Sequence, residues 1–204
     1  MRVYFVRHGQ TDWNVALRIQ GHTDIPLNAN GEKKAYELAA RLAQNRDKYP
    51  IDALYCSYLQ RARRTADIIG QAIGVKARVA DDLEEINMGS YEGLTWKEVE
   101  ERFADRYELW NENRFTMPPV GSNESYEDVF FRVKGAMDTL VRQADPAVRS
   151  IAIVTHGGVL RPILVNLTGA DKAHMEDLEI PNLALLATDY DPQTGAWTYA
   201  GTER

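Results

Sequence analysis

The stretch Ile151-Ala152-Ile153-Val154-Thr155-His156-Gly157-Gly158 decides the fold that this sequence predicts. Its first part is an apolar, β-branched run that is typical of a buried strand. Apolar residues at helical spacing follow it and stop at Gly169, a residue type that favours the left-handed backbone found after helices. The apolar positions of this predicted helix are Leu160, Ile163, Leu164 and Leu167. A buried strand that passes through a short polar turn into a helix indicates an α/β protein.

Strands and helices alternate along the rest of the chain as well. Further strands are predicted at Val3–Val6 and Ala53–Cys56, with a closing hairpin of Leu183–Tyr190 and Trp197–Gly201. Further helices are predicted after the capping residues Asn28, Ser57 and Ser125, and over residues 95–114 in one or two pieces. The stretch Leu83–Gly93 is predicted to be a loop. These elements predict a three-layer α/β/α sandwich around a mostly parallel central sheet.

The length of the chain predicts one domain. With 204 residues, 44% of them hydrophobic, the chain can bury one core but is short for two. It contains no internal repeat and no low-complexity linker. We therefore expect a single domain over residues 1–204, with residues 95–125 as a lid or specificity insertion.

Composition excludes several classes of protein. The net charge of −6 gives no overall basic field, so we expect no binding to nucleic acid, and any bound anion requires a local cluster of cations. The single cysteine, Cys56, excludes an intrachain disulfide framework and a cysteine zinc finger. Only four apolar residues separate Arg2 from Arg7, too few for a signal sequence or a spanning helix. We expect a soluble, cytoplasmic protein that does not contact membranes.

Charged or nucleophilic side chains follow three of the predicted strands. Arg7 and His8 end the first, residues 57–61 follow the second, and His156 ends the third. Ligands of open α/β sheets bind beyond the carboxyl ends of the strands. The glycine after each histidine lets a ligand approach the backbone, and the helix that begins near Gly158 adds amide donors and a positive dipole end. This arrangement predicts a phosphate site.

Blocks of residues in a fixed order carry a resemblance to a known family. They are Arg7-His8-Gly9-Gln10-Thr11, Trp13-Asn14, Gln20-Gly21, Ser57, Arg61-Ala62, Thr65-Ala66, Leu83-Glu84-Glu85-Ile86, Gly89, Tyr91-Glu92-Gly93 and Thr155-His156-Gly157-Gly158. With these blocks the sequence resembles the histidine phosphatase superfamily over nearly its whole length. That superfamily includes cofactor-dependent phosphoglycerate mutases, the bisphosphatase of fructose 2,6-bisphosphate, and small broad-specificity or α-ribazole phosphatases. The resemblance implies a phosphoglycerate mutase-like fold.

The resemblance also implies a role for each residue of the site. His8 attacks phosphorus and forms a phosphohistidine, which requires a neutral imidazole. Arg7 and Arg61 offer planar forks for the phosphate, and His156, protonated beside it, completes the cradle. Glu85 is the expected general acid, which later activates water. The expected substrate-binding residues are Asn14, Gln20, Gly21 and Gly157. No cofactor and no metal are expected.

Several residues keep alternative interpretations at this stage. Glu84 adjoins Glu85 and competes with it for the role of acid, although the family spacing favours Glu85. His22 could contact either substrate or solvent. Arg161 could pair only locally. The remaining polar candidates, Arg63, Arg64 and His174, are expected to be exposed, and the aromatic residues Trp96, Tyr107 and Trp110 are expected to pack in the core or a lid.

The same residues bear on three competing functions. A zinc hydrolase is disfavoured because no HExxH-like spacing exists and arginines adjoin the histidines. A non-catalytic phosphate-binding relative is disfavoured because every expected catalytic residue type is present. The runner-up is a cofactor-dependent phosphoglycerate mutase, but related mutases have a longer stretch between the acid and the second histidine than the 71 residues (156 minus 85) found here. We therefore predict a phosphatase for a small phosphorylated metabolite, leaving open the substrate's identity and whether the protein forms a homodimer.

Overall fold

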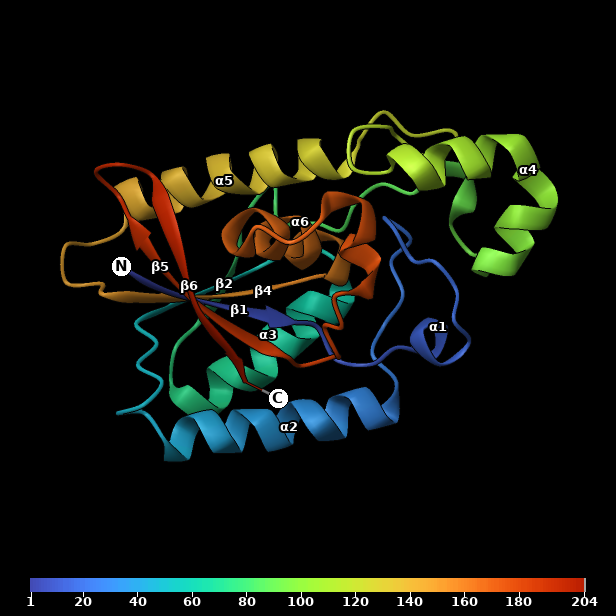
Figure 1. The fold of residues 1–204 in the computed structure, drawn as a ribbon. Helices are drawn as coiled ribbons and strands as arrows, with labels where there is room; N and C mark the ends of the chain where they lie inside the picture. Colours follow the sequence, from blue (N-terminus) through green and yellow to red (C-terminus); the bar gives the residue numbers. More distant parts are fainter. Residues whose placement is uncertain (204) are drawn as a thin grey trace.

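The centre of the molecule is a six-stranded sheet, described by a computed structural model over residues 1–203 (Figure 1). Its strands are β1 (Arg2–Arg7), β2 (Ala53–Cys56), β3 (Ala77–Val79), β4 (Ser150–Thr155), β5 (Leu185–Asp191) and β6 (Ala196–Glu203). In the order β3-β2-β4-β1-β5-β6, the first four strands are parallel and the last two are antiparallel to their neighbours. The predicted α/β class with a mostly parallel sheet and a closing hairpin is confirmed.

Helices cover both faces of the sheet. Figure 1 shows α2 (Ala29–Gln44) and α3 (Gln60–Ile73) below it, and α5 (Tyr126–Gln143) and α6 (Gly157–Thr168) above it. The short α1 (Asp12–Val15) and the kinked α4 (Trp96–Asn113) lie beyond the carboxyl end of β1, and the 3₁₀ turns are η1 (Gly89–Tyr91) and η2 (Lys172–Asp177). Over the described part of the chain, no helix combines the length and the apolar character needed to span a membrane.

Alternation along the central strands creates two cores. On β1, Val3 and Phe5 pack with α5 and α6, whereas Tyr4 and Val6 pack with α2 and α3. Every residue of β4 is buried, because a central parallel strand is covered on both faces. Because successive side chains of a strand point to opposite faces of the sheet, helices cover both faces and the three predicted layers result.

Most helix ends lie where the sequence predicts them. Asn28 caps α2 by accepting a hydrogen bond from the Gly31 amide at 2.8 Å, and Ser125 opens α5 with a capping box. The predicted cap at Ser57 is wrong, because α3 begins at Gln60 and its N-cap Leu59 makes no side-chain capping bond. Ser57 Oγ instead accepts from the Leu59 amide at 3.2 Å and shapes the turn that precedes the helix. The edge strand β3, three residues long, is absent from the prediction.

The register of the parallel strands aligns their carboxyl ends. Arg7 of β1 lies opposite Thr155 of β4, and Cys56 of β2 lies opposite Val154 of β4. The residues that follow these strands therefore emerge at the same edge of the sheet.

Candidate active site

His8 and His156 lie next to each other at this edge. The His8 amide donates to the Thr155 carbonyl at 2.9 Å, which extends the pairing of β1 and β4 by one residue. Both side chains are buried, and their ring centroids are 5.1 Å apart. Two histidines 148 residues apart in sequence (156 minus 8) are thus brought together by strand pairing.

The protonation and orientation of His8 suit a nucleophile. Its Nδ1 lies 2.7 Å from the carbonyl oxygen of Gly9, and a carbonyl only accepts, so Nδ1 carries the proton and Nε2 keeps a lone pair. Burial, together with the charges of Arg61 and Arg7, lowers the pKa of His8 well below 6.5. The Gly9 amide is held in turn by the Thr65 hydroxyl at 3.0 Å. A neutral imidazole with a fixed tautomer results.

Two buried arginines flank this histidine pair. Arg61, in the first turn of α3, donates to the carbonyl oxygens of Gly21 and Thr23, each at 2.8 Å. Arg7 donates from Nη1 to the Ile180 carbonyl. Burial, then the charge of Arg161, lowers the pKa of Arg7 to about 10, so it stays cationic near neutral pH. Each arginine is therefore anchored to backbone by its terminal nitrogens.

A cavity of about 410 Å³ opens in front of His8. Among the predicted site residues, those that line it are Arg7, His8, Asn14, Gln20, Gly21 and Glu85. Arg61 and His156 are fully buried and do not reach the cavity wall. Within residues 1–203, the Nε atoms of Arg7 and Arg61 and both ring nitrogens of His156 have no hydrogen-bond partner. The histidine pair is therefore surrounded by polar nitrogens that lack a partner and suit an anion.

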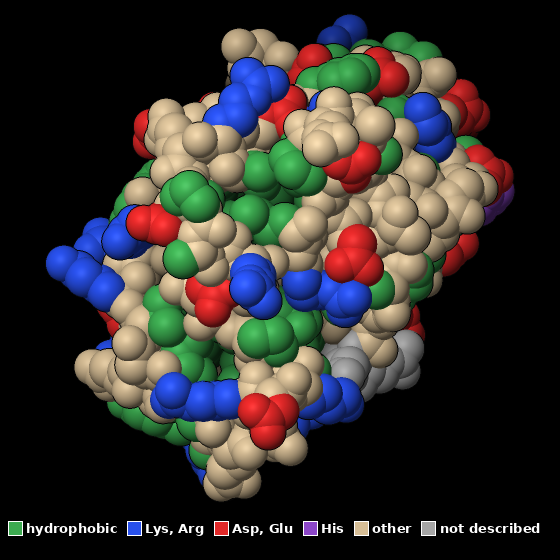
Figure 2. Space-filling model, turned by 90° about the vertical axis from the view of Figure 1, so that its left-hand side faces the viewer, with side chains coloured by type: hydrophobic (Ala, Val, Ile, Leu, Met, Phe, Trp, Pro, Cys, Tyr) green, Lys and Arg blue, Asp and Glu red, His purple; other side chains and the backbone are tan. Residues whose placement is uncertain are grey.

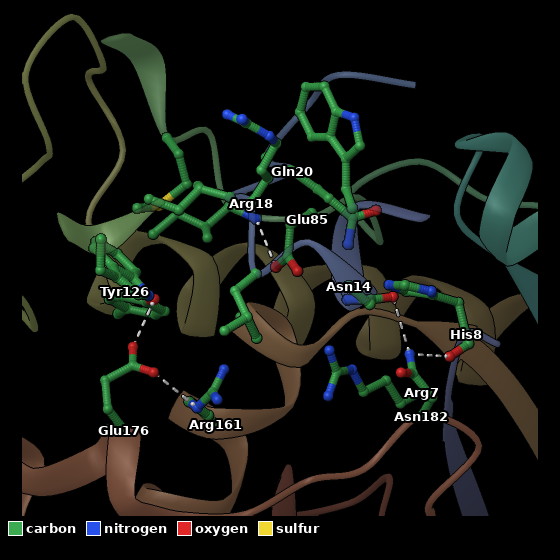
Figure 3. A pocket seen from close by; sticks show the side chains of 18 residues that line it. Arg7, His8, Asn14, Arg18, Gln20, Glu85, Tyr126, Arg161, Glu176 and Asn182 are labelled. Atoms are coloured by element: carbon green, nitrogen blue, oxygen red, sulfur yellow. Dashed lines mark hydrogen bonds and ion pairs between the residues drawn. The ribbon is translucent and has the colours of Figure 1, made fainter. Parts of the chain in front are cut away.

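A small amide cluster borders the cavity beside His8 (Figure 3). Thr11 is the N-cap of α1, and its amide donates to Asn14 Oδ1 at 3.0 Å. Gln20 Oε1 accepts from the Thr11 hydroxyl at 3.1 Å. Asn182 Nδ2 donates to the His8 carbonyl at 2.9 Å and reaches Asn14 Oδ1 at 3.4 Å. Asn182 is not among the residues predicted from sequence, although its position directly before a predicted strand was a signal for it.

The side chain of Glu85, and not that of Glu84, lines the cavity. Glu85 Oε1 accepts from the Ile86 amide at 3.0 Å. It also lies over Gly158, where a Cβ atom would come within 2.3 Å of this oxygen, so a larger residue there would displace the Glu85 carboxylate. Glu84 instead pairs with Arg132 of α5 at 3.5 Å. The geometry therefore favours Glu85 of the two neighbouring glutamates.

Glu92 organises the loop that holds Arg61. Its carboxylate accepts from the amides of His22 and Thr23, at 2.9 and 3.0 Å, and from the Thr23 hydroxyl at 2.7 Å. Gly21 has a φ of +51°, and a Cβ atom there would lie 2.1 Å from this carboxylate. The role of Gly21 seen here is to present its carbonyl to Arg61. Glu92 belongs to one of the motif blocks, but its role in this loop was not predicted from sequence.

The remaining candidates fall into three groups. Gly157 lies off the cavity wall, next to Arg7 and Arg161. Arg161 lines the cavity and pairs with Glu176, so its pairing is part of the site. Of the residues expected to be exposed, Arg63 is exposed and His174 pairs with Asp171 in solvent, whereas Arg64 is half-buried and pairs with Glu32. Trp110 is buried as expected, and Trp96 stacks on it with ring centroids 5.6 Å apart but stays partly exposed.

The site contains no grouping of metal ligands. Across residues 1–203, no three or more His, Cys, Asp or Glu side chains are grouped so that they could hold a metal ion. Cys56 is buried, and burial raises the pKa of its thiol to about 12. The charged groups nearest to His8 are arginines, which suit an anionic ligand.

Comparisons with known proteins show which family this chain resembles. The family model described as "Histidine phosphatase superfamily (branch 1)" matches residues 3–201. A metal-independent phosphoserine phosphatase from Arabidopsis thaliana is 34% identical over 84% of this chain and 70% of its own length. Phosphoglycerate mutase-like protein 4 from the same plant is 33% identical over 79% of this chain and 68% of its own length. A mycobacterial glucosyl-3-phosphoglycerate phosphatase, solved with VO3, superimposes with a TM-score of 0.81 at 28% identity, covering 98% of this chain and 96% of that chain.

Proposed function

Because this chain belongs to the histidine phosphatase superfamily, we propose that it hydrolyses the phosphate ester of a small metabolite through a phosphohistidine on His8. One observation carries the assignment. His8 is buried beside His156, with Nδ1 hydrogen-bonded to a carbonyl and Nε2 available as a nucleophile. Phosphoryl transfer needs such a nucleophile within a cluster of cationic groups, which Arg7 and Arg61 supply.

In the first half-reaction, His8 Nε2 attacks the phosphorus atom and a P–N bond forms. The bond between phosphorus and the ester oxygen breaks, and its electron pair leaves with the oxygen. Glu85, protonated at this stage, gives its proton to that oxygen, and the alcohol departs. The position of Glu85 over the first turn of α6, on the cavity wall, supports this role.

In the second half-reaction, water replaces the alcohol. The Glu85 carboxylate takes a proton from water, the oxygen attacks phosphorus, and the P–N bond breaks. His8 returns to its neutral form, Glu85 is again protonated, and inorganic phosphate leaves. In this proposal Glu85 transfers the protons and the cationic side chains stabilise the charge on the phosphoryl group, so the reaction as proposed uses no metal and no cofactor.

In this proposal the transferring phosphoryl group is stabilised by Arg7 and Asn14, which line the cavity, and from behind its wall by the buried Arg61 and His156. Burial first, then Arg61, His8 and Arg7, lower the pKa of His156 well below 6.5, so it is neutral in the free site. A phosphate dianion opposes this effect and favours a protonated His156 that donates a hydrogen bond. Gln20, Gly21 and Gly157 act beside them: Gln20 orders the loop, Gly21 holds Arg61, and Gly157 leaves space between two arginines.

The substrate is a small molecule. A cavity of about 410 Å³ suits a metabolite, and the acidic chain lacks the basic field that nucleic acid requires. On the face at the amino end of β1, Figure 2 shows basic side chains mixed with acidic ones. The lid in this proposal is residues 95–125, in one domain with the rest: Trp96 lines the cavity, and an isolated bridge joins Thr95 to Arg18.

A phosphoglycerate mutase is the second candidate, since one relative at 33% identity has the name mutase-like. A mutase must keep water from its phosphohistidine until the product is rephosphorylated. The separation of 71 residues between Glu85 and His156 (156 minus 85) leaves a short insertion for that purpose. Hydrolysis is therefore the primary proposal.

Trapping of the intermediate tests the nucleophile directly. Label from a phosphorylated substrate should remain on the wild-type protein as an acid-labile, base-stable adduct. His8→Ala should lose this adduct and all turnover while it keeps the wild-type circular dichroism spectrum. An adduct that persists in the folded His8→Ala protein would show that His8 is not the nucleophile.

A further inference from the structure

A turn at residues 181–184, directly before β5, is bound to the end of β1. The Ala184 amide donates to the Pro181 carbonyl at 3.0 Å and closes the turn. The Leu183 amide donates to the Arg7 carbonyl at 3.0 Å, and the Arg7 amide donates to the Ala184 carbonyl at 3.1 Å. The turn therefore continues the antiparallel pairing of β1 with β5 to the last residue of β1.

Leu183 holds this turn in a conformation that leucine rarely adopts. Its φ is +65°, in the left-handed region that favours glycine. Such an outlier persists where the surrounding contacts fix the backbone, and outliers of this kind gather at functional sites. The two backbone bonds to Arg7 are contacts of that kind. The turn is thus kept against its own backbone preference, and it carries Asn182 on the cavity wall.

The side chain of Asn182 joins two groups of the proposed reaction. Its Nδ2 donates to the His8 carbonyl at 2.9 Å and to Asn14 Oδ1 at 3.4 Å, and dashed lines in Figure 3 mark both contacts. An amide nitrogen carries two protons, so this one atom can serve both acceptors. Asn182 therefore connects the turn to the proposed nucleophile and to a proposed ligand of the phosphoryl group.

The bond to the His8 carbonyl fixes one end of the peptide group between His8 and Gly9. At the other end, the Gly9 amide donates to the Thr65 hydroxyl at 3.0 Å. A planar peptide group that is held at both ends cannot rotate freely. Its orientation sets the course of the chain into Gly9, whose carbonyl lies 2.7 Å from His8 Nδ1 and fixes the tautomer of the ring. The lone pair on His8 Nε2 therefore depends on this peptide group.

Asn182 also restricts the orientation of the Asn14 amide. Asn14 Oδ1 accepts from the Thr11 amide at 3.0 Å and from the Thr11 hydroxyl at 3.1 Å, in addition to Asn182. Because Oδ1 is occupied by these donors, Nδ2 is the end of the Asn14 amide that is left for a ligand. A phosphoryl oxygen needs that end, since only an N–H group can donate to it.

We propose that Asn182 is a positioning residue for the nucleophile: it holds the peptide between His8 and Gly9 and keeps the Nε2 lone pair of His8 aimed into the cavity. The inference rests on the proposed phosphohistidine reaction. Asn182 itself makes and breaks no covalent bond. Its effect is therefore expected in the free protein, before any substrate binds.

The imidazole nitrogens of His8 report this effect directly. The chain has four histidines, so ¹⁵N-labelled histidine gives a simple NMR spectrum in which His8→Ala identifies the signals of His8. In the free wild type we expect one tautomer, protonated on Nδ1. In Asn182→Ala we expect a mixture with the tautomer protonated on Nε2.

A single turnover with nitrophenyl phosphate measures the kinetic effect. This leaving group departs without a proton, so the burst of nitrophenolate reports attack by His8 and not the action of Glu85. We expect the burst rate of Asn182→Ala to be about 10- to 100-fold lower than that of the wild type, because a small misplacement of a reacting group has an effect of this size.

Two variants separate the hydrogen bonds of Asn182 from its bulk. Asn182→Asp fills the same space but has no N–H, so it should lose the single tautomer as Asn182→Ala does. Asn166→Ala is the matched control, because the exposed Asn166 also donates to a backbone carbonyl, that of Pro162 in α6. It should keep the wild-type spectrum and burst rate. A wild-type spectrum in Asn182→Asp would show that Asn182 only fills space and would overturn the inference.

A wild-type spectrum in Asn182→Ala would also overturn it, even with a slower burst, because Asn182 would then act on the substrate and not on His8. A mixture of tautomers in the wild type would do the same. Trapping separates these failures from a failure of the proposed function. If the wild type becomes labelled on His8 but the spectrum of Asn182→Ala is unchanged, only the role of Asn182 is wrong. If no phosphorylated substrate labels His8, the proposed reaction is wrong and the inference falls with it.

Discussion

The imidazole of His22 donates from Nε2 to the carbonyl oxygen of Glu85 over 2.8 Å. The same loop supplies the Gly21 and Thr23 carbonyls that hold Arg61. On the other side, Arg132 donates to the carbonyl oxygen of Glu84 at 3.1 Å. One loop therefore sets the positions of the proposed proton donor and of a phosphate-binding arginine.

His22→Phe is predicted to slow hydrolysis of alkyl phosphates by about 10-fold while nitrophenyl phosphate is affected much less. The substitution removes the donor that fixes the Glu85 backbone, and a misplaced acid matters only where the leaving group needs a proton. His22→Gln keeps a donor and should recover part of the rate. Equal losses on both substrates, measured as kcat/KM, would assign His22 to the loop alone and not to Glu85.

Glu85→Gln is predicted to cost roughly 10²- to 10⁴-fold with an alkyl phosphate and far less with nitrophenyl phosphate, which departs without a proton. Glu84→Gln is the control, because its side chain pairs with Arg132 away from the cavity wall. We expect it to retain the wild-type contrast between the two substrates. If Glu84→Gln, and not Glu85→Gln, lost far more rate with the alkyl phosphate than with nitrophenyl phosphate, Glu84 would be the acid.

Stability is predicted to fall as pH drops below about 6.5. His8 and His156 are both held neutral in the folded protein, with pKa values well below 6.5, while the unfolded chain takes up protons at that pH. The unfolded state therefore binds more protons, and the free energy of unfolding decreases by at most about 1.4 kcal/mol per pH unit for each histidine. Exposed His174, whose pKa is raised by Asp171, acts in the opposite direction.

Urea denaturation at pH 7.5, 6.5 and 5.5 measures this slope. His156→Gln should make it shallower, because one of the two buried groups no longer titrates. A slope unchanged in that variant would mean that His156 is not the group kept neutral by burial.

Turnover is predicted to release inorganic phosphate without a bisphosphorylated primer. If water reaches the phosphohistidine through the open cavity, adding 2,3-bisphosphoglycerate gives no activation, and interconversion of 3- and 2-phosphoglycerate is slower than phosphate release. Chelators should leave the rate unchanged, and vanadate should inhibit, because arginines stabilise a trigonal bipyramid. Primer-dependent interconversion faster than phosphate release would favour the mutase.

The sequence by itself determined the layers and most of the candidate site. The contiguous apolar runs at residues 3–6 of β1 and 151–154 of β4 predict central strands, because such strands are covered on both faces. Capping residues such as Asn28 and Ser125 act over one helical turn, so local sequence reveals them. Motif order likewise predicted His8, Arg61 and His156, since strand ends bring such residues to one edge of the sheet.

Only the tertiary structure decided how these residues are held. The contacts from Arg61 to Gly21, from His22 to Glu85 and from Arg161 to Glu176 join residues far apart in sequence or on different elements. Such contacts leave no periodic pattern in the sequence, because they depend on where loops meet after the sheet has formed. Packing likewise separates the two glutamates: the Glu85 side chain fills the space over Gly158, and Glu84 pairs with Arg132.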